Sequence, residues 1–260
     1  MSYETLQFET AGEVATVTLN RPEKRNAISA KMIEELLTAL NEVETGAARV
    51  GIITGAGKAF CAGIDLDGLR AIASQTPEEN VEDSRRMAKM FYRIFSFPKP
   101  LIAAVNGAAI AGGCGIATLC DFTLAVPETK FGYTEVKIGF IPALVSVFLR
   151  RQVGDKVTRD LLLSGRLIEA EDAQRLGLVS QIVEPESLME QARSLALDII
   201  AASPTSIRRT KRLLLRSGEA QLQTEIENAI HENADIRSTE DFKEGLASFL
   251  EKRAPKWPGH

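Results

Sequence analysis

The amino-acid sequence predicts an α/β core followed by a helical C-terminal region. Up to about residue 200, short runs with the alternating or apolar pattern of strands alternate with runs of helical period. From Pro204 onward the apolar residues keep a helical period throughout. A chain of 260 residues suits one large domain with an appendage, because a single core stops growing near ~250 to 300 residues. We therefore expect an α/β core over residues 1–200 and a helical region over residues 201–260.

The first expected elements are a hairpin, a helix and a strand. A strand that ends near Phe8, a turn at Ala11-Gly12 and an alternating run over residues 14–19 are typical of a hairpin. Ser29 is the expected N-cap of the next helix. The apolar face of that helix, at three-and-four spacing, comprises Met32, Ile33, Leu36, Leu37, Leu40 and Val43. A strand over residues 50–54 follows directly.

The alternation continues through the middle of the chain. After a glycine-rich segment at residues 55–63 we expect a variable charged stretch at residues 73–86, and then a helix, a strand, a turn and a helix up to residue 119. Further elements are expected as strands at residues 122–126 and 178–183 and a helix at residues 142–153.

Residues 101–120 contain no charge, and 20 uncharged residues have the length of a membrane span. Pro100 precedes this run, and Asn106-Gly107 inside it is a turn dipeptide. The run is also mostly alanine and glycine. We therefore expect a buried strand, a turn and a buried helix here.

The helical tail needs a surface that covers its apolar positions. These positions are Leu213, Leu214, Leu215, Leu222, Ile226, Ile230, Phe242, Leu246, Phe249 and Leu250. The covering surface is either the chain's own body or a neighbouring subunit. Oligomerisation is therefore a hypothesis at this point.

Charge and cysteine content exclude several classes of protein. Lys and Arg number 31 against 35 Asp and Glu, so the net charge of -4 gives no overall attraction to nucleic acid or anionic membrane. The first ten residues are polar and acidic where a signal peptide is basic and then apolar, so we expect a cytoplasmic protein. Cys61, Cys114 and Cys120 lie among small apolar residues without metal-ligand spacing, so we expect packing residues and neither a disulfide nor a metal site.

Several kinds of catalytic site are also excluded. The only histidines are His231 and His260, and no Gly-x-Ser-x-Gly motif is present, which argues against serine and cysteine hydrolases. A phosphate loop at Gly55 to Lys58 fails because Ala59 stands where a Ser or Thr should bind magnesium. The partial Gly-x-Gly at the same place does not indicate a nicotinamide cofactor.

Two glycine-rich turns and one glutamate remain as candidates for chemistry. Residues 60–65 and 111–115 are rich in small residues and lie at expected strand-to-helix turns. Unobstructed backbone N–H groups at such turns can bind an anion. For either turn alone, the more common explanation is that the glycines only permit a tight turn or close helix packing. Glu135 follows a predicted strand and precedes an apolar stretch. Most such glutamates are solvated, but one that faces an apolar pocket would have a raised pKa and could exchange protons.

A series of short motifs runs through the chain in a fixed order. They are Asn20-Arg21-Pro22 with Asn26-Ala27, residues 57–65 (GKAFCAGID), residues 103–107 (AAVNG) with Ala111-Gly112-Gly113, Cys120-Asp121, and Glu135 with Gly139 and Pro142. In this order they resemble the enoyl-CoA hydratase/isomerase (crotonase) family. The resemblance covers nearly the whole chain and continues to residues 249–253.

The resemblance implies a crotonase-like spiral of ββα units with a C-terminal helical trimerisation region, assembled as a homotrimer or homohexamer. It implies an acyl-CoA thioester as substrate and no cofactor or metal, because CoA is part of the substrate. The backbone N–H groups of Ile64 and Gly112 would form the oxyanion hole, and Glu135 would be the catalytic acid and base. The implied CoA-binding residues are Ala62, Lys24, Arg25 and Lys252.

One position departs from the family pattern. Many family hydratases carry a second glutamate where this chain has Gly115, so a two-glutamate mechanism is not expected. Residues 112–117 and 134–143 are similar to the bacterial methylglutaconyl-CoA hydratase-like branch, which also lacks the second glutamate. We therefore predict hydration of a 2-enoyl-CoA. Isomerisation of a 3-enoyl-CoA and decarboxylation of an acyl-CoA are the alternatives within the fold.

Two alternatives belong to other classes. The basic residues at 208–212 and Arg216 suggest RNA binding, but no aromatic stacking platform accompanies them, so a solvated helix face is the preferred interpretation. A non-catalytic CoA-binding or purely structural oligomer is the other alternative. The acyl group stays open, because residues 66–86 and 143–147 would shape its pocket and shape does not follow from one sequence.

Overall fold

The strands of the protein form two sheets. A computed structural model describes residues 3–72 and 74–259. In the larger sheet the order is β1 (Leu6–Ala11), β2 (Val14–Leu19), β3 (Val50–Gly55), β5 (Leu101–Val105), β7 (Phe122–Ala125) and β10 (Gln181–Ile182). In the smaller sheet the order is β4 (Ala59–Cys61), β6 (Ala108–Ile110), β8 (Lys130–Gly132) and β9 (Ile168–Glu169).

Successive strands of the chain alternate between the two sheets. β3, β5 and β7 lie in the larger sheet, and each is followed by a strand of the smaller sheet, β4, β6 or β8. β1 and β2 form the predicted antiparallel hairpin, with Leu6 opposite Leu19, and β2, β3, β5, β7 and β10 run parallel. The predicted α/β class is therefore confirmed, although the sequence did not reveal the short strands of the smaller sheet.

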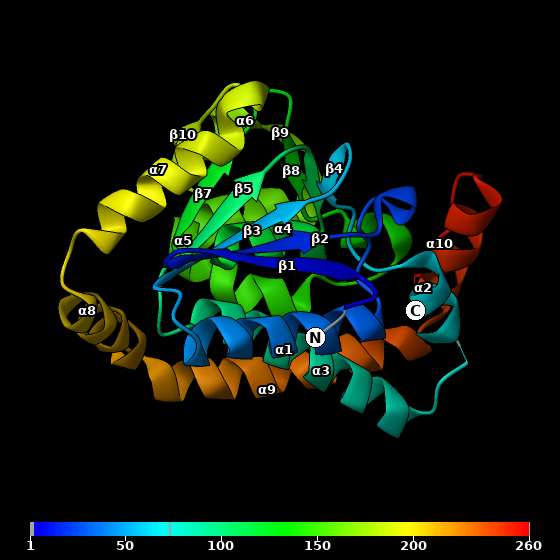
Figure 1. The fold of residues 1–260 in the computed structure, drawn as a ribbon. Coiled ribbons are helices and arrows are strands. Elements are labelled where there is room, and N and C mark those ends of the chain that lie inside the picture. Colours follow the sequence, from blue (N-terminus) through cyan, green and yellow to red (C-terminus); the bar gives the residue numbers. More distant parts are fainter. Residues whose placement is uncertain (1–2, 73, 260) are drawn as a thin grey trace.

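Helices cover both faces of the larger sheet (Figure 1). The helices of the α/β core are α1 (Ala30–Thr45), α2 (Leu66–Ile72), α3 (Pro77–Phe95), α4 (Gly112–Leu119), α5 (Ala143–Ser164), α6 (Ala170–Arg175) and α7 (Leu188–Ile200). Short 3-10 turns are η1 (Pro22–Lys24), η2 (Glu135–Ile138) and η3 (Pro185–Ser187). On one face Ile52 and Ile102 pack against α7, and on the other Ile53 and Ala103 pack in the main core with α1, α3 and α4. Adjacent residues point to opposite faces because side chains alternate along a strand.

In the uncharged run at residues 101–120, the predicted buried strand and buried helix are present as β5 and the fully buried α4. The short strand β6 lies between them and was not predicted. None of the helices in the described parts of the chain has both the length and the apolar character needed to cross a bilayer.

Several predicted boundaries are wrong. α3 begins at Pro77, inside the stretch expected to be variable, because Thr76 and Glu79 form a capping box in which each side chain bonds the other's backbone N–H. α5 continues to Ser164 beyond a kink at Gly154, whose φ is 72°. β10 contains only two residues of the strand expected at residues 178–183.

The helical tail comprises α8 (Pro204–Arg216), α9 (Glu219–Asp235), η4 (Ile236–Ser238) and α10 (Glu240–Glu251). α9 lies along α3 and α5 of its own body (Figure 1), and Leu222, Ile226 and Ile230 join the main core. α8 contributes no buried residue, and Leu213 and Leu214 on it are 70% and 71% exposed. The body of the same chain therefore covers α9 and part of Leu215, and it leaves Leu213 and Leu214 of α8 uncovered.

Candidate active site

One cavity brings together most of the predicted site residues. It has a volume of about 580 Å³, and its walls include η1 and the residues after it, the segment that follows β4, α3, the start of α4, η2 and the start of α5. The predicted residues that line it are Lys24, Arg25, Ala62, Ile64, Gly112 and Glu135. Lys252 lies elsewhere, as the exposed C-cap of α10, and is not among the described residues that line the cavity.

Glu135, the first residue of η2, presents a buried carboxyl group to this cavity. The residue is only 9% exposed, and among the described residues its Oε2 atom has no hydrogen-bond partner. Burial raises the pKa of this carboxyl to about 7, although its own backbone N–H acts in the opposite direction. A carboxyl group with this pKa can both accept and donate a proton near neutral pH.

Two backbone N–H groups at the cavity are available for an anion. The Ile28 N–H donates to the Gly63 carbonyl at 2.7 Å, and the Asp65 N–H donates to the Ile28 carbonyl at 3.0 Å. Ile28 therefore pairs with the residues on either side of Ile64 and does not use the Ile64 N–H. Gly112 is the first residue of α4, where a helix leaves its N–H groups without internal partners. Neither the Ile64 nor the Gly112 N–H donates a hydrogen bond to another described residue.

Glycines allow the two turns that carry these N–H groups to meet. A Cβ atom on Gly63 would lie 3.0 Å from the Cβ of Ala111 and 3.9 Å from the nitrogen of Gly112, and the φ of Gly63 is +90°. A Cβ atom on Gly113 would lie 2.2 Å from the Cys61 carbonyl oxygen, a distance that no side chain tolerates. The small residues are therefore required for the close approach of β4 to α4, and that approach places both donors at one cavity.

Ion pairing and a buried asparagine fix the loops at the mouth of the cavity. Arg21 forms an ion pair with Asp65 at 2.5 Å, next to Ile64. Burial acts to raise the pKa of the Asp65 carboxyl, but the hydrogen bond from the Asp67 backbone N–H and the Arg21 guanidinium hold this pKa below its usual range. Asn26 is fully buried, and its Nδ2 atom donates to the carbonyls of Ala56 and Ala59 at 2.9 and 2.8 Å. These contacts hold the loop that carries Lys24 and Arg25 against the segment that carries Ile64.

The position of the missing second glutamate is occupied by neighbouring side chains. A Cβ atom on Gly115 would lie 2.9 Å from Cγ1 of Val145 and 3.1 Å from Cε1 of Phe91. A carboxylate at residue 115 would therefore displace two core side chains. Among the described residues at this wall of the cavity, no second glutamate accompanies Glu135.

The sequence interpretation anticipated part of the cavity wall and missed the rest. Residues 66–86 and 143–147 were expected to shape the pocket, and Leu69, Asp83 and residues 143–145 line it. Met87 and Phe91 on α3, Asn233 on α9 and Arg237 on η4 also line it and were not expected. The four-residue spacing of the α3 positions was visible in the sequence, because residues at i and i+4 share a helix face. Nothing in the sequence indicated that Asn233 and Arg237, about 150 residues further along, would join them.

With this geometry established, comparison with known proteins identifies the family. The sequence of residues 9–260 matches the sequence model of the enoyl-CoA hydratase/isomerase family. The chain belongs to this family. A candidate enoyl-CoA hydratase of Thermus thermophilus is 47% identical over 247 residues, which cover 95% of this chain and 98% of the relative. The short-chain-enoyl-CoA hydratase of Clostridium acetobutylicum is 34% identical over 260 residues, with 97% of each chain covered.

Solved structures of family members have the same fold. An enoyl-CoA hydratase/isomerase from Xanthobacter autotrophicus superposes with a TM-score of 0.90 at 30% identity, covering 99% of this chain and all of the other. The predicted crotonase-like α/β fold is thereby confirmed, as is the predicted family. The methylglutaconyl-CoA hydratase-like branch within the family stays a prediction.

Proposed function

We propose that this protein is an enoyl-CoA hydratase, a carbon–oxygen lyase that adds water to the double bond of a 2-enoyl-CoA thioester. The observation that carries the proposal is the buried Glu135 carboxyl, with its unpartnered Oε2 and a pKa near 7, in one cavity with the free N–H groups of Ile64 and Gly112. The homologues named as enoyl-CoA hydratases support the same activity.

In the proposed mechanism the thioester carbonyl oxygen accepts hydrogen bonds from the N–H groups of Ile64 and Gly112. Ionised Glu135 removes a proton from a water molecule as the water oxygen attacks C3, and the negative charge moves to the carbonyl oxygen as an enolate. Protonated Glu135 then gives its proton to C2, so that hydroxyl and hydrogen have been added and Glu135 is ionised again. Loss of one oxyanion donor typically slows such reactions ~10²- to 10³-fold.

A single carboxyl group also suits isomerisation, the second candidate. Glu135 would then move a proton from C2 of a 3-enoyl-CoA to C4, and no water would be consumed. The filled space at Gly115 favours any mechanism that needs only one carboxyl group. Both reactions require no cofactor besides the CoA that belongs to the substrate.

The experiment that tests the proposal uses heavy-oxygen water. The purified protein is incubated with crotonyl-CoA and with 3-hexenoyl-CoA, and ultraviolet absorbance and product mass are followed. Hydration predicts loss of the conjugated absorbance of crotonyl-CoA with label in the product, and Glu135→Gln should abolish it. Glu128→Gln, an exposed glutamate on the loop between β7 and β8, is the matched control. An absorbance gain from the 3-enoyl substrate without label would instead establish the isomerase, and no reaction with either would refute both.

Binding of the CoA portion is proposed for Lys24, Arg25 and Ala62 at the mouth of the cavity. Lys252 stays a predicted CoA contact outside the cavity wall.

We propose a homotrimer or a homohexamer, because the exposed Leu213 and Leu214 of α8 need a covering surface that the described part of the chain does not supply. Light scattering of the purified protein checks the assembly. A cytoplasmic location, with no nucleic-acid or membrane partner, likewise stays a proposal that rests on composition.

A further inference from the structure

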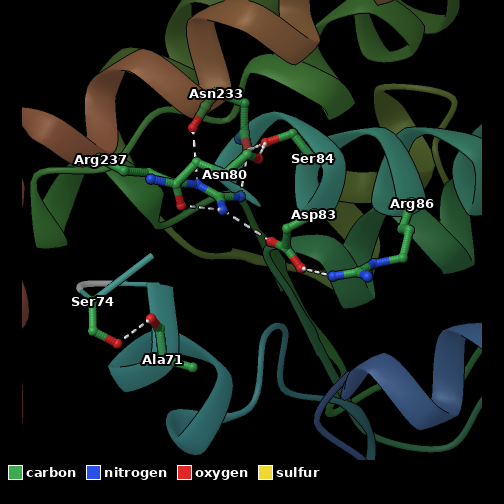
Figure 2. Close-up of polar contacts among 8 residues, drawn as sticks. All are labelled: Ala71, Ser74, Asn80, Asp83, Ser84, Arg86, Asn233 and Arg237. Atoms are coloured by element: carbon green, nitrogen blue, oxygen red, sulfur yellow. Dashed lines mark hydrogen bonds and ion pairs between the residues drawn. The ribbon is translucent and has the colours of Figure 1, made fainter. Parts of the chain in front are cut away.

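Most polar side chains of the cavity wall are either paired or exposed. Asp65 forms an ion pair with Arg21 at 2.5 Å. The Arg237 guanidinium donates to Asp83 and to the Asn233 side chain, both at 2.9 Å (Figure 2). Three further charged residues of the wall are exposed: Glu23, Lys24 and Arg25. Only two polar residues of the described wall remain, and they are adjacent in the chain.

Thr134 carries the one hydroxyl group among the described residues that line the cavity, and Glu135 follows it directly. Thr134 is the N-cap of η2, a position where a threonine hydroxyl commonly accepts a hydrogen bond from a nearby backbone N–H. Here the side chain forms no cap bond, and no other described residue bonds its Oγ1 atom. The Oγ1 atom is not buried either, so water can reach this unused acceptor.

Contacts with α4 fix the place of Thr134 in the cavity. The Ala111 N–H, next to the start of α4, donates to the Gly132 carbonyl at 2.7 Å. Tyr133 is fully buried, and its hydroxyl oxygen lies 3.2 Å from that of Thr118 on α4. Two residues of chain span at most about 7 Å, so Thr134 lies within that distance of Gly132. The segment that carries Thr134 is therefore held against the start of α4, which supplies one of the proposed oxyanion donors.

A water molecule that attacks C3 must present an oxygen lone pair to that carbon. Ionised Glu135 accepts one water hydrogen, but a single hydrogen bond leaves the water free to rotate about it. A second acceptor fixes the direction of the lone pair. Many family hydratases carry a second glutamate, and here Phe91 and Val145 fill the space at Gly115. A threonine hydroxyl has acceptor lone pairs of its own and can fix the water without a second charge.

We propose that Thr134 positions the attacking water: its Oγ1 accepts a hydrogen bond from one water hydrogen while Glu135 removes the other. This inference rests on the proposed hydratase function. As the water oxygen attacks C3, the hydrogen that faces Thr134 stays on the new hydroxyl group, and no proton moves to or from Thr134. The later transfer from Glu135 to C2 involves no water and needs only the two oxyanion donors. Thr134 is therefore a positioning residue whose loss should affect the water step alone.

The first measurement is the hydration of crotonyl-CoA by variants of Thr134. Thr134→Val keeps the branched shape and removes the hydroxyl group, so kcat should fall ~10- to 10²-fold with KM unchanged, as expected for a misplaced reacting group. Thr134→Ser keeps the hydroxyl group and should keep most of the rate. Thr10→Val, at an exposed threonine of β1, is the matched control and should change neither constant. An unchanged kcat in Thr134→Val, or an equal loss in Thr134→Ser, would overturn the inference.

The second measurement separates the water step from the placement of Glu135. Exchange of the C2 hydrogens of butyryl-CoA in deuterated water needs Glu135 and the two oxyanion donors but no attacking water. Thr134→Val should therefore leave the exchange rate unchanged while it slows hydration. A parallel loss of exchange and hydration would show that the substitution displaces Glu135, and it would overturn the inference. If Thr134→Val does not fold, Thr134→Ala, which also lacks the hydroxyl group, is measured in the same two reactions.

The outcomes also separate this inference from the proposed function. Hydration of crotonyl-CoA that is equally fast with and without the Thr134 hydroxyl group would leave the hydratase proposal intact and refute the role of Thr134. Failure of the unmodified protein to hydrate crotonyl-CoA would refute the hydratase proposal itself.

Discussion

Replacing Glu135 with glutamine should lower activity and raise stability at the same time. The substitution keeps the shape of the side chain and removes the group that transfers the proton. General acid–base catalysis by a positioned side chain typically contributes ~10²- to 10⁴-fold, so kcat should fall by that factor. In the unmodified protein kcat/KM should rise with pH and level off above about 7, because only ionised Glu135 can accept the proton from water.

The stability effect follows from the pKa of the same carboxyl group. Burial raises this pKa from 4.5 to about 7, so the unfolded chain holds the ionised form more favourably than the folded chain does. Stability is therefore fully present below about pH 4.5 and is lost as pH rises through about 7. At about 1.4 kcal/mol per pKa unit the loss reaches about 3 kcal/mol above neutral pH. Glutamine does not titrate, so the advantage of Glu135→Gln should grow by about 2 kcal/mol between about pH 5.5 and about pH 8.5.

Urea unfolding at these two pH values, together with hydration rates, measures both effects in one set of proteins. Glu128→Gln, an exposed substitution of the same kind, should change neither the rate nor the pH dependence of the free energy of unfolding. A Glu135→Gln variant whose stability advantage does not change with pH would show that the folded protein does not raise the pKa of this carboxyl. A variant that hydrates crotonyl-CoA at the unmodified rate would show that Glu135 is not the base.

Three further substitutions test the remaining parts of the site. Gly113→Ala should destabilise the protein by about 1 to 3 kcal/mol in urea unfolding, because its Cβ would lie 2.2 Å from the Cys61 carbonyl oxygen; an unchanged midpoint would contradict the close approach of β4 and α4. Gly115→Glu should lower the hydration rate at least ~10-fold, because the new side chain would collide with Phe91 and would not restore a two-glutamate site. A rise in the hydration rate would refute this steric argument. Lys24→Ala should raise KM for an acyl-CoA about 2- to 5-fold and leave KM for the matching pantetheine thioester, which lacks the CoA phosphates, unchanged. Equal effects on the two thioesters would remove Lys24 from the proposed CoA site.

Short-range sequence patterns were sufficient for much of the fold. The hairpin of β1 and β2, the Ser29 cap of α1 and the division of residues 101–120 into strand, turn and helix all depend on contacts within a few residues. The missed start of α3 was also encoded locally, in the Thr76 and Glu79 capping box. The smaller sheet was missed because its strands have only two or three residues, too few to establish a period.

The candidate site divides in the same way. The sequence by itself determined which residues could supply chemistry, since the glycine-rich turns, Glu135 and the absence of other catalytic types are visible in the order of the residues. Only the tertiary structure decided the pKa of Glu135, because burial by an apolar wall is a property of packing. It also decided that Gly115 faces Phe91 and Val145, and that Arg237 meets Asp83 more than 150 residues away in the chain. Desolvation and contacts between distant segments exist only once the chain has folded, so no local pattern can record them.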